Sequence, residues 1–177
     1  MAYYWPDMER GERVSSQPTW AQWLEGRGAQ LLLFARTQTR NDADAEDVVQ
    51  ETLAELFRKS PVAPPPLPVV YATVRRRAID LGRSTNRRLA REEAATEGQS
   101  TTCWFDDSLE QRERAQLLDA ALRRLPANQR EVVTLKLWGD LTFAQIAETL
   151  DIPINTAASR YRYGLAFLRQ HVPLEHP

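Results

Sequence analysis

Apolar residues recur every three or four positions through most of the chain, which is the spacing of helices that bury one face. The long stretches with this spacing run from Trp20 to about Thr39, from Asp42 to just before Ser60, from Pro68 to about Glu92 and from Leu109 to Leu125. Thr19 and Gln22 match a capping box at the start of the first stretch. Three shorter helical stretches follow, up to about Gln170. The pattern therefore predicts an all-α fold.

The stretch from residue 125 to residue 171 has especially clear helix boundaries. Pro126 suits a first helical turn because its missing N–H needs no partner there, and Gly139 is expected to end that helix. Thr142 and Gln145 match a capping box, which predicts a second helix from about Phe143. Leu141 and Ile146 are placed to form its hydrophobic staple.

The second helix is predicted to be short and a third to follow it closely. The sequence Asp151-Ile152-Pro153 interrupts the helical pattern after about two turns, and Asn155 is the expected cap of the third helix. Two helices joined by a tight turn form the helix-turn-helix unit, whose second helix lies in the major groove of DNA.

The third helix of this unit carries polar and apolar residues on different faces. Its candidate DNA-reading residues are Thr156, Ser159, Arg160 and Arg162. Its core-facing positions are Ala157, Tyr161, Leu165 and Leu168, spaced by four, four and three. The alternative interpretation is a helical hairpin with a solvated polar face.

Composition limits the class of protein. The chain has 177 residues, is 42% hydrophobic and 27% charged, and carries a formal net charge of −1, which argues against a nucleic-acid binder that uses its whole surface. Cys103 is the single cysteine, and no apolar run is long enough for a membrane span, so a cytoplasmic protein without membrane insertion is expected. No Cys or His cluster predicts a metal, and no cofactor is expected.

The first half of the chain combines an acidic helix start with a basic helix. Asp42, Asp44, Glu46 and Asp47 crowd the start of the second predicted helix, where the helix dipole favours negative charge. Carboxylates can also bind Mg²⁺ or support acid–base catalysis, but no nucleophile, phosphate loop or histidine partner accompanies them, so an enzyme is not expected.

The third predicted helix buries Val70, Val74, Ala78 and Leu81 and places arginines on its other faces. The basic set consists of Arg75, Arg76, Arg77, Arg83, Arg87, Arg88 and Arg91, with Asp80 as the one acid among them. Asp80 is expected to orient Arg76 and Arg83 through helical pairing. Clustered arginine favours phosphate binding, although such a run is often only a solvated face.

The remaining segments predict the domain boundaries. Residues 1–18 form a tail with Tyr3, Tyr4 and Trp5 that can pack on the body or on a partner, and residues 19–91 form a first helical domain. The five prolines between Ser60 and Pro68 favour a stiff connector over an SH3-type ligand. Residues 92–108 read as a flexible linker, with residues 109–173 as a second helical domain.

Three motifs in order resemble the sigma-70 family, specifically the small two-domain ECF group of bacterial transcription initiation factors. DAEDVVQETL at residues 44–53 looks like the family's polymerase-docking helix, and RRRAIDLGR at residues 75–83 resembles its −10 stretch. Residues 125–160 are similar to its fourth region, which reads the −35 element. The resemblance covers about residues 29–171.

The resemblance assigns a role to each surface. It implies polymerase docking by Asp47, Gln50, Glu51, Leu53 and Phe57, and −10 contacts by Arg75, Arg76, Arg77, Asp80, Arg83, Arg87 and Arg88. It gives −35 contacts to Thr156, Ser159, Arg160 and Arg162. The implied partners are core RNA polymerase, through its β′ clamp helices and β flap, promoter DNA and a possible anti-sigma factor.

The chain departs from the family pattern at several positions. Ala157-Ala158 stands where the family usually has Val-Lys, Val69 about where it has tryptophan, and Arg76 where it has asparagine. These departures bear on promoter melting more than on polymerase binding. The alternative function is therefore a diverged sigma-like or simple helix-turn-helix DNA-binding regulator that does not direct initiation.

Overall fold

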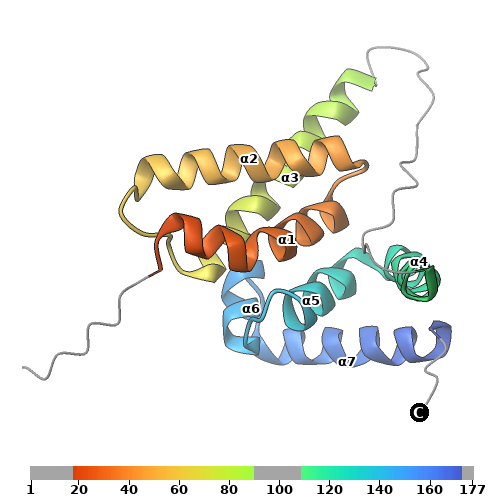
Figure 1. Cartoon of the computed structure of the whole chain (residues 1–177). Helices are drawn as coiled ribbons and strands as arrows, with labels where there is room; N and C mark the ends of the chain where they lie inside the picture. Colours follow the sequence, from red (N-terminus) through yellow and green to blue (C-terminus); the bar gives the residue numbers. More distant parts are fainter. Residues whose placement is uncertain (1–17, 90–108, 173–177) are drawn as a thin grey trace, which may run out of the picture.

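The computed structural model describes residues 18–89 and 109–172, and every regular element within these ranges is an α-helix (Figure 1). Residues 18–89 form the N-terminal half and residues 109–172 the C-terminal half. The all-α prediction is confirmed. The predicted linker and the aromatic tail residues Tyr3, Tyr4 and Trp5 lie outside the described residues.

Three helices build the N-terminal half: α1 (Trp20–Gln38), α2 (Asp42–Lys59) and α3 (Leu67–Leu89). The predicted capping box of Thr19 and Gln22 begins α1, and the Asn41 side chain accepts a hydrogen bond from the Asp44 N–H to begin α2. Each helix of this half packs against the other two. Helix α3 starts one residue before Pro68, in line with the tolerance of a first turn for proline.

Four helices build the C-terminal half: α4 (Leu109–Arg124), α5 (Ala127–Leu137), α6 (Phe143–Leu150) and α7 (Ile154–His171). Helices α5 and α6 lie between the N-terminal half and α7 (Figure 1). The most extensive contacts between the halves run from α1 to α5 and from α3 to α6.

The capping box at Thr142 and Gln145 is confirmed, and the two expected staple residues, Leu141 and Ile146, are fully buried. One predicted boundary is wrong. The cap of α7 is Pro153, not Asn155, because the Pro153 carbonyl accepts hydrogen bonds from the N–H groups of Thr156 and Ala157. Asn155 therefore lies exposed in the first turn of α7.

The end of α5 lies where Gly139 was expected to stop the helix, since α5 ends at Leu137 and its C-cap is Trp138. The left-handed residue is Asp140, with φ of 58°, and Gly139 has a negative φ. Glycine is needed at 139 for space, because a Cβ atom there would lie 2.7 Å from the Leu135 carbonyl oxygen.

The apolar core crosses from one half to the other. One cluster joins Tyr71 and Val74 of α3 to Leu141, Ile146 and other residues of the C-terminal half. The predicted α3 stripe is confirmed, with Val70, Val74 and Ala78 buried and Leu81 packed at its edge. Among the described residues, no helix is long and apolar enough to cross a membrane.

Candidate nucleic-acid interface

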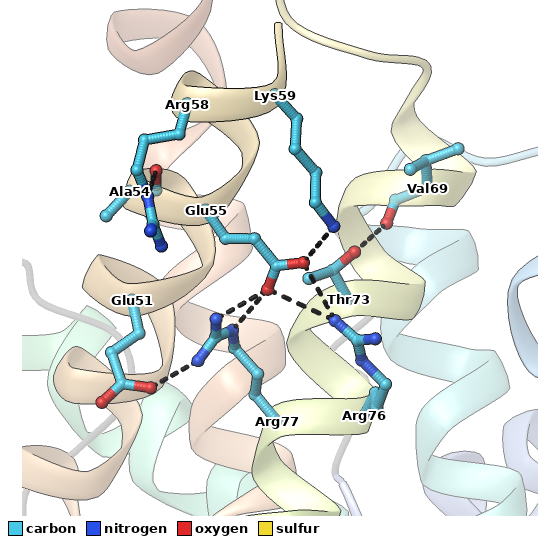
Figure 2. Close-up of polar contacts among 9 residues, drawn as sticks. All are labelled: Glu51, Ala54, Glu55, Arg58, Lys59, Val69, Thr73, Arg76 and Arg77. Atoms are coloured by element: carbon cyan, nitrogen blue, oxygen red, sulfur yellow. Dashed lines mark hydrogen bonds and ion pairs between the residues drawn. The ribbon is translucent and has the colours of Figure 1, made fainter.

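A carboxylate on α2 gathers three cations at the seam between α2 and α3. The Glu55 side chain accepts hydrogen bonds from Lys59 at 2.5 Å, from Arg77 at 2.6 Å and from Arg76 at 3.2 Å (Figure 2). The Lys59 and Arg77 hydrogen bonds, followed by that of Arg76, hold the pKa of Glu55 at about 2 against a usual 4.5. Glu55 is therefore ionised at any physiological pH.

The same seam uses a second acid. Arg77 also donates to Glu51 at 2.5 Å, so this guanidinium bridges two carboxylates one helical turn apart (Figure 2). Glu51 is a predicted polymerase-docking residue, and its side chain stays 67% exposed despite the ion pair. The expectation that Asp80 orients Arg76 is wrong, because Arg76 pairs with Glu55 of α2 instead.

The basic face of α3 is consequently divided in two. Its beginning is neutralised: Arg75 pairs with Glu131 of α5, and Arg76 and Arg77 pair with acids of α2. Its end carries the more loosely paired charge. Arg83 lies 3.9 Å from Asp80 with three quarters of its side chain exposed, and Arg87 donates to the Arg83 carbonyl oxygen.

An open surface hollow marks this second part of α3. Asp80, Arg83, Asn86 and Arg87 line it. The hollow is open to solvent, and two of its four lining residues are arginines, which commonly contact phosphate oxygens in protein–DNA complexes. The side chain of Arg88 lies outside the described residues.

The predicted polymerase-docking residues share the outer face of α2. Asp47, Gln50 and Glu51 are exposed, Leu53 is half-buried against the core, and Phe57 is 51% exposed. Phe57 also packs edge-on against Trp20 of α1, with ring centroids 5.8 Å apart. The face therefore offers acids along its length and an aromatic ring at its end.

The helix-turn-helix presents α7 with most of its polar residues outward. Arg162 is exposed and its guanidinium lies over the Tyr163 ring at 5.3 Å, while Thr156, Ser159 and Arg160 are half-buried. Among the described residues, no carboxylate pairs with Arg160 or Arg162. The Ser159 hydroxyl donates to the Thr156 carbonyl oxygen, so its proton is engaged within the helix.

The structure adds residues that the pattern analysis missed. Gly164 is the contact point of α7 with α5, since a Cβ atom there would lie 2.5 Å from Val133 Cγ2. Glu131 is buried against Arg75, a pairing of residues 56 positions apart that no local spacing indicates. Glu55 stands four residues before Lys59, a helical pairing visible in the sequence.

The predicted core face of α7 is correct in outline. Ala157 and Leu168 are buried, and Tyr161 packs partly buried with its ring 5.5 Å from that of Phe143. Leu165 is half-buried, and Gly164 beside it is buried. No group of three or more metal-ligating side chains occurs among the described residues.

Comparison with known proteins shows that this chain is similar to sigma factors. The family model of sigma-70 region 4 matches residues 115–168. The ECF RNA polymerase sigma factor RpoE of Cereibacter sphaeroides is 31% identical over 134 residues, which are 73% of each chain. The ECF RNA polymerase sigma factor SigL of Mycobacterium tuberculosis is 32% identical over 148 residues, 80% of this chain and 81% of SigL.

A solved structure shares the fold. It is the sigma factor RpoE of Bartonella quintana in complex with the anti-sigma factor NepR, with a TM-score of 0.70 and 21% identity. The match covers 88% of this chain and 97% of that one. From these relatives and the matched fourth region, the chain belongs to the ECF group of sigma-70 family RNA polymerase sigma factors and acts in transcription initiation.

Proposed function

We propose that this sigma factor binds core RNA polymerase and directs it to promoters that carry a −10 and a −35 element. In this proposal α2 docks on the β′ clamp helices, the C-terminal half docks on the β flap, and α7 reads the −35 element. The end of α3, with Arg83 and Arg87, serves the −10 element.

The contrast between two groups of arginines carries the proposal. Arg75, Arg76 and Arg77 each have an acid partner within the protein, whereas Arg160 and Arg162 pair with no carboxylate among the described residues. An arginine that remains unpaired on a recognition helix is available to guanine or phosphate. Family membership supports binding to RNA polymerase, and the unpaired arginines of α7 support selection of a DNA sequence.

Transcript mapping tests the proposal. A reaction with the purified chain, sigma-free core polymerase and genomic fragments from the same source should give new 5′ ends downstream of a shared two-part motif. A bidentate arginine–guanine contact contributes about 1–3 kcal/mol, so Arg160→Ala should weaken binding to the −35 DNA roughly 5- to 150-fold at fixed salt.

Arg169→Ala is the matched control, because Arg169 is an exposed arginine in the last turn of the same helix. It should change the affinity little. Equal affinities of the wild type and Arg160→Ala would count against −35 reading by α7.

One observation favours a second candidate function, a sigma-like regulator that binds DNA or polymerase without opening promoters. The first three arginines of the −10 stretch are occupied by acids, and this arrangement weakens contact with a melting strand. Binding of core polymerase without any new 5′ end would select this candidate.

An anti-sigma partner belongs to the proposal as well. The solved sigma factor that shares this fold is held by an anti-sigma factor. We propose a comparable protein partner here, which co-purification from the native source would reveal as a stoichiometric companion of the chain.

A further inference from the structure

The turn between α1 and α2 is fixed by hydrogen bonds on both sides of Arg40. The Thr39 hydroxyl lies 3.0 Å from the Ala35 carbonyl oxygen and 3.2 Å from that of Asn41, and both are acceptors for it. The Asn41 side chain caps α2 by accepting a hydrogen bond from the Asp44 N–H at 2.8 Å. The backbone of Arg40 is therefore held at a defined position between two helices.

From this turn the Arg40 side chain reaches α3, 46 residues further along the chain (Figure 1). Its guanidinium donates to the Asn86 Oδ1 atom at 2.6 Å, and both residues are exposed. A guanidinium carries five N–H donors, so this one hydrogen bond does not exhaust its capacity to bind an anion. Because Oδ1 is the acceptor, the NH2 group of Asn86 is the part of that side chain that can donate to a ligand.

Asn86 belongs to the hollow at the end of α3, which Asp80, Arg83 and Arg87 also line. Arg83, Asn86 and Arg87 are three and four positions apart, so their side chains share one face of the helix. Asp80 is the one acid among these four residues, and it lies about 9 Å along the helix axis from Asn86. The Asn86 end of the hollow is therefore positive, and Arg40 approaches it from outside α3.

We propose that Arg40 and Asn86 complete a phosphate-binding site at the end of α3, which takes a backbone phosphate of promoter DNA. Arg40, Arg83 and Arg87 supply the positive charge, and Asn86 holds the Arg40 guanidinium in place. The inference rests on the proposed function, in which this end of α3 serves the −10 element. An arginine that is already held in place loses less side-chain freedom on binding than a freely rotating one.

The competing explanation is a tether, in which the Arg40–Asn86 hydrogen bond only keeps the end of α3 in position. The two explanations differ in their salt dependence. Loss of a phosphate contact lowers the slope of log affinity against log salt concentration, because fewer counterions are released from the DNA. Loss of a tether changes the affinity by the same factor at every salt concentration.

Fluorescence anisotropy of a short labelled duplex of random sequence measures this difference with the full chain and without polymerase. One phosphate contact on duplex DNA contributes about 0.9 to the slope. Arg40→Gln should therefore weaken binding about 15-fold at about 0.05 M salt but only about fourfold at about 0.2 M. The same titration with one of the two strands distinguishes the sources of the phosphate: a larger loss on the duplex assigns the site to paired DNA, and a larger loss on the single strand assigns it to melted DNA.

Arg58→Gln is the matched control, because it removes an exposed arginine from the same half. Arg58 donates to the Ala54 carbonyl oxygen of its own helix, about 24 Å along α2 from the turn that carries Arg40. This distance exceeds the screening length of about 10 Å at 0.1 M salt, so the slope should not change.

Two further variants test the role of each partner. Arg40→Lys keeps the charge and should retain most of the salt slope. Asn86→Ala removes the hydrogen bond that holds Arg40 and should weaken duplex binding about threefold. The same substitution should have less effect in the Arg40→Gln background, because the two residues act as a unit.

The outcomes separate this inference from the proposed function. A ratio of wild-type to Arg40→Gln affinity that stays constant from low to high salt overturns the phosphate site in favour of the tether. A wild-type chain that binds neither probe at the lowest salt concentration overturns it as well. Neither result bears on transcript mapping, since the assay contains no polymerase. Arg40-dependent DNA binding without any new 5′ end would overturn promoter opening and leave the phosphate site standing.

Discussion

Glu55 concentrates more charge interaction than any other acid described in the structure, and its pKa of about 2 makes the consequence testable. A carboxyl whose pKa is lower in the folded state than its usual 4.5 stabilises the fold fully above that value. The stabilisation falls as the pH drops from 4.5 and is lost below about 2. The seam between α2 and α3 should therefore loosen in acid.

Glu55→Gln is expected to lower the free energy of unfolding by about 1 kcal/mol at pH 7, since two of its three cation partners are largely solvated. Urea unfolding at several pH values measures this difference. The gap between wild type and variant should close between pH 4.5 and 2, because the wild-type carboxylate becomes protonated in that range.

Asp80→Asn is the control for this prediction. Its pair with Arg83 is 3.9 Å long and both side chains are more than half exposed, so the change should stay below about 0.5 kcal/mol. A gap between wild type and Glu55→Gln that persists unchanged at pH 2 would show that the charge of Glu55 is not the cause.

At the scale of a helix, replacing glycine with alanine is expected to change the free energy of unfolding in opposite directions at two positions. Gly164 faces Val133 so closely that an added methyl group would lie 2.5 Å from it, whereas Gly82 of α3 has no atom within 4 Å of that position. Gly164→Ala should lower the free energy of unfolding by about 1–3 kcal/mol through overpacking. Gly82→Ala should raise it by about 0.5–1 kcal/mol through lower backbone entropy.

Urea midpoints of the two variants provide the measurement, and a double variant isolates the cause. Val133→Ala removes the atom that the new methyl group meets, so Gly164→Ala should cost less in that background than in the wild type. Equal costs in both backgrounds would refute the close contact between α5 and α7.

Helix boundaries were predictable where a short-range signal decides them. The capping boxes at Thr19 and Thr142 involve residues three positions apart, and both formed as expected. Asn155 had the right chemistry for a cap, but the turn ends earlier because the N–H of Ile152 reaches the Ala147 carbonyl oxygen. That hydrogen bond depends on the backbone path after α6, which side-chain preference does not reveal.

At the scale of the whole molecule, periodicity predicted which faces are buried but not what covers them. The stripe through Val70 and Val74 is correct, yet part of its cover comes from α6, some 70 residues further along the chain. The basic run of α3 was recognisable by composition. The close pairing of Arg75, Arg76 and Arg77, in contrast to the more exposed Arg83 and Arg87, depends on Glu51, Glu55 and Glu131, which lie on other helices.

The ionisation of the Tyr71 hydroxyl offers a final test of how the two halves pack together. Burial raises the pKa of its hydroxyl to about 12, and the charges of Arg27 and Asp140, which form an ion pair between the two halves, also act on it. A hydroxyl whose pKa is raised from 10 stabilises the fold fully below pH 10, and this contribution is lost as the pH rises towards 12. Ultraviolet titration should show a late ionisation step in the wild type that is lost in Tyr71→Phe.

The same titration reports whether the N-terminal and C-terminal halves stay packed together in the absence of polymerase and DNA. If the halves separate more often in Glu131→Gln, water reaches Tyr71 more often, and its late ionisation should move down towards pH 10. Glu148→Gln should leave it in place. A late step that stays near pH 12 in Glu131→Gln would show that the Arg75–Glu131 pair does not control the access of water to Tyr71.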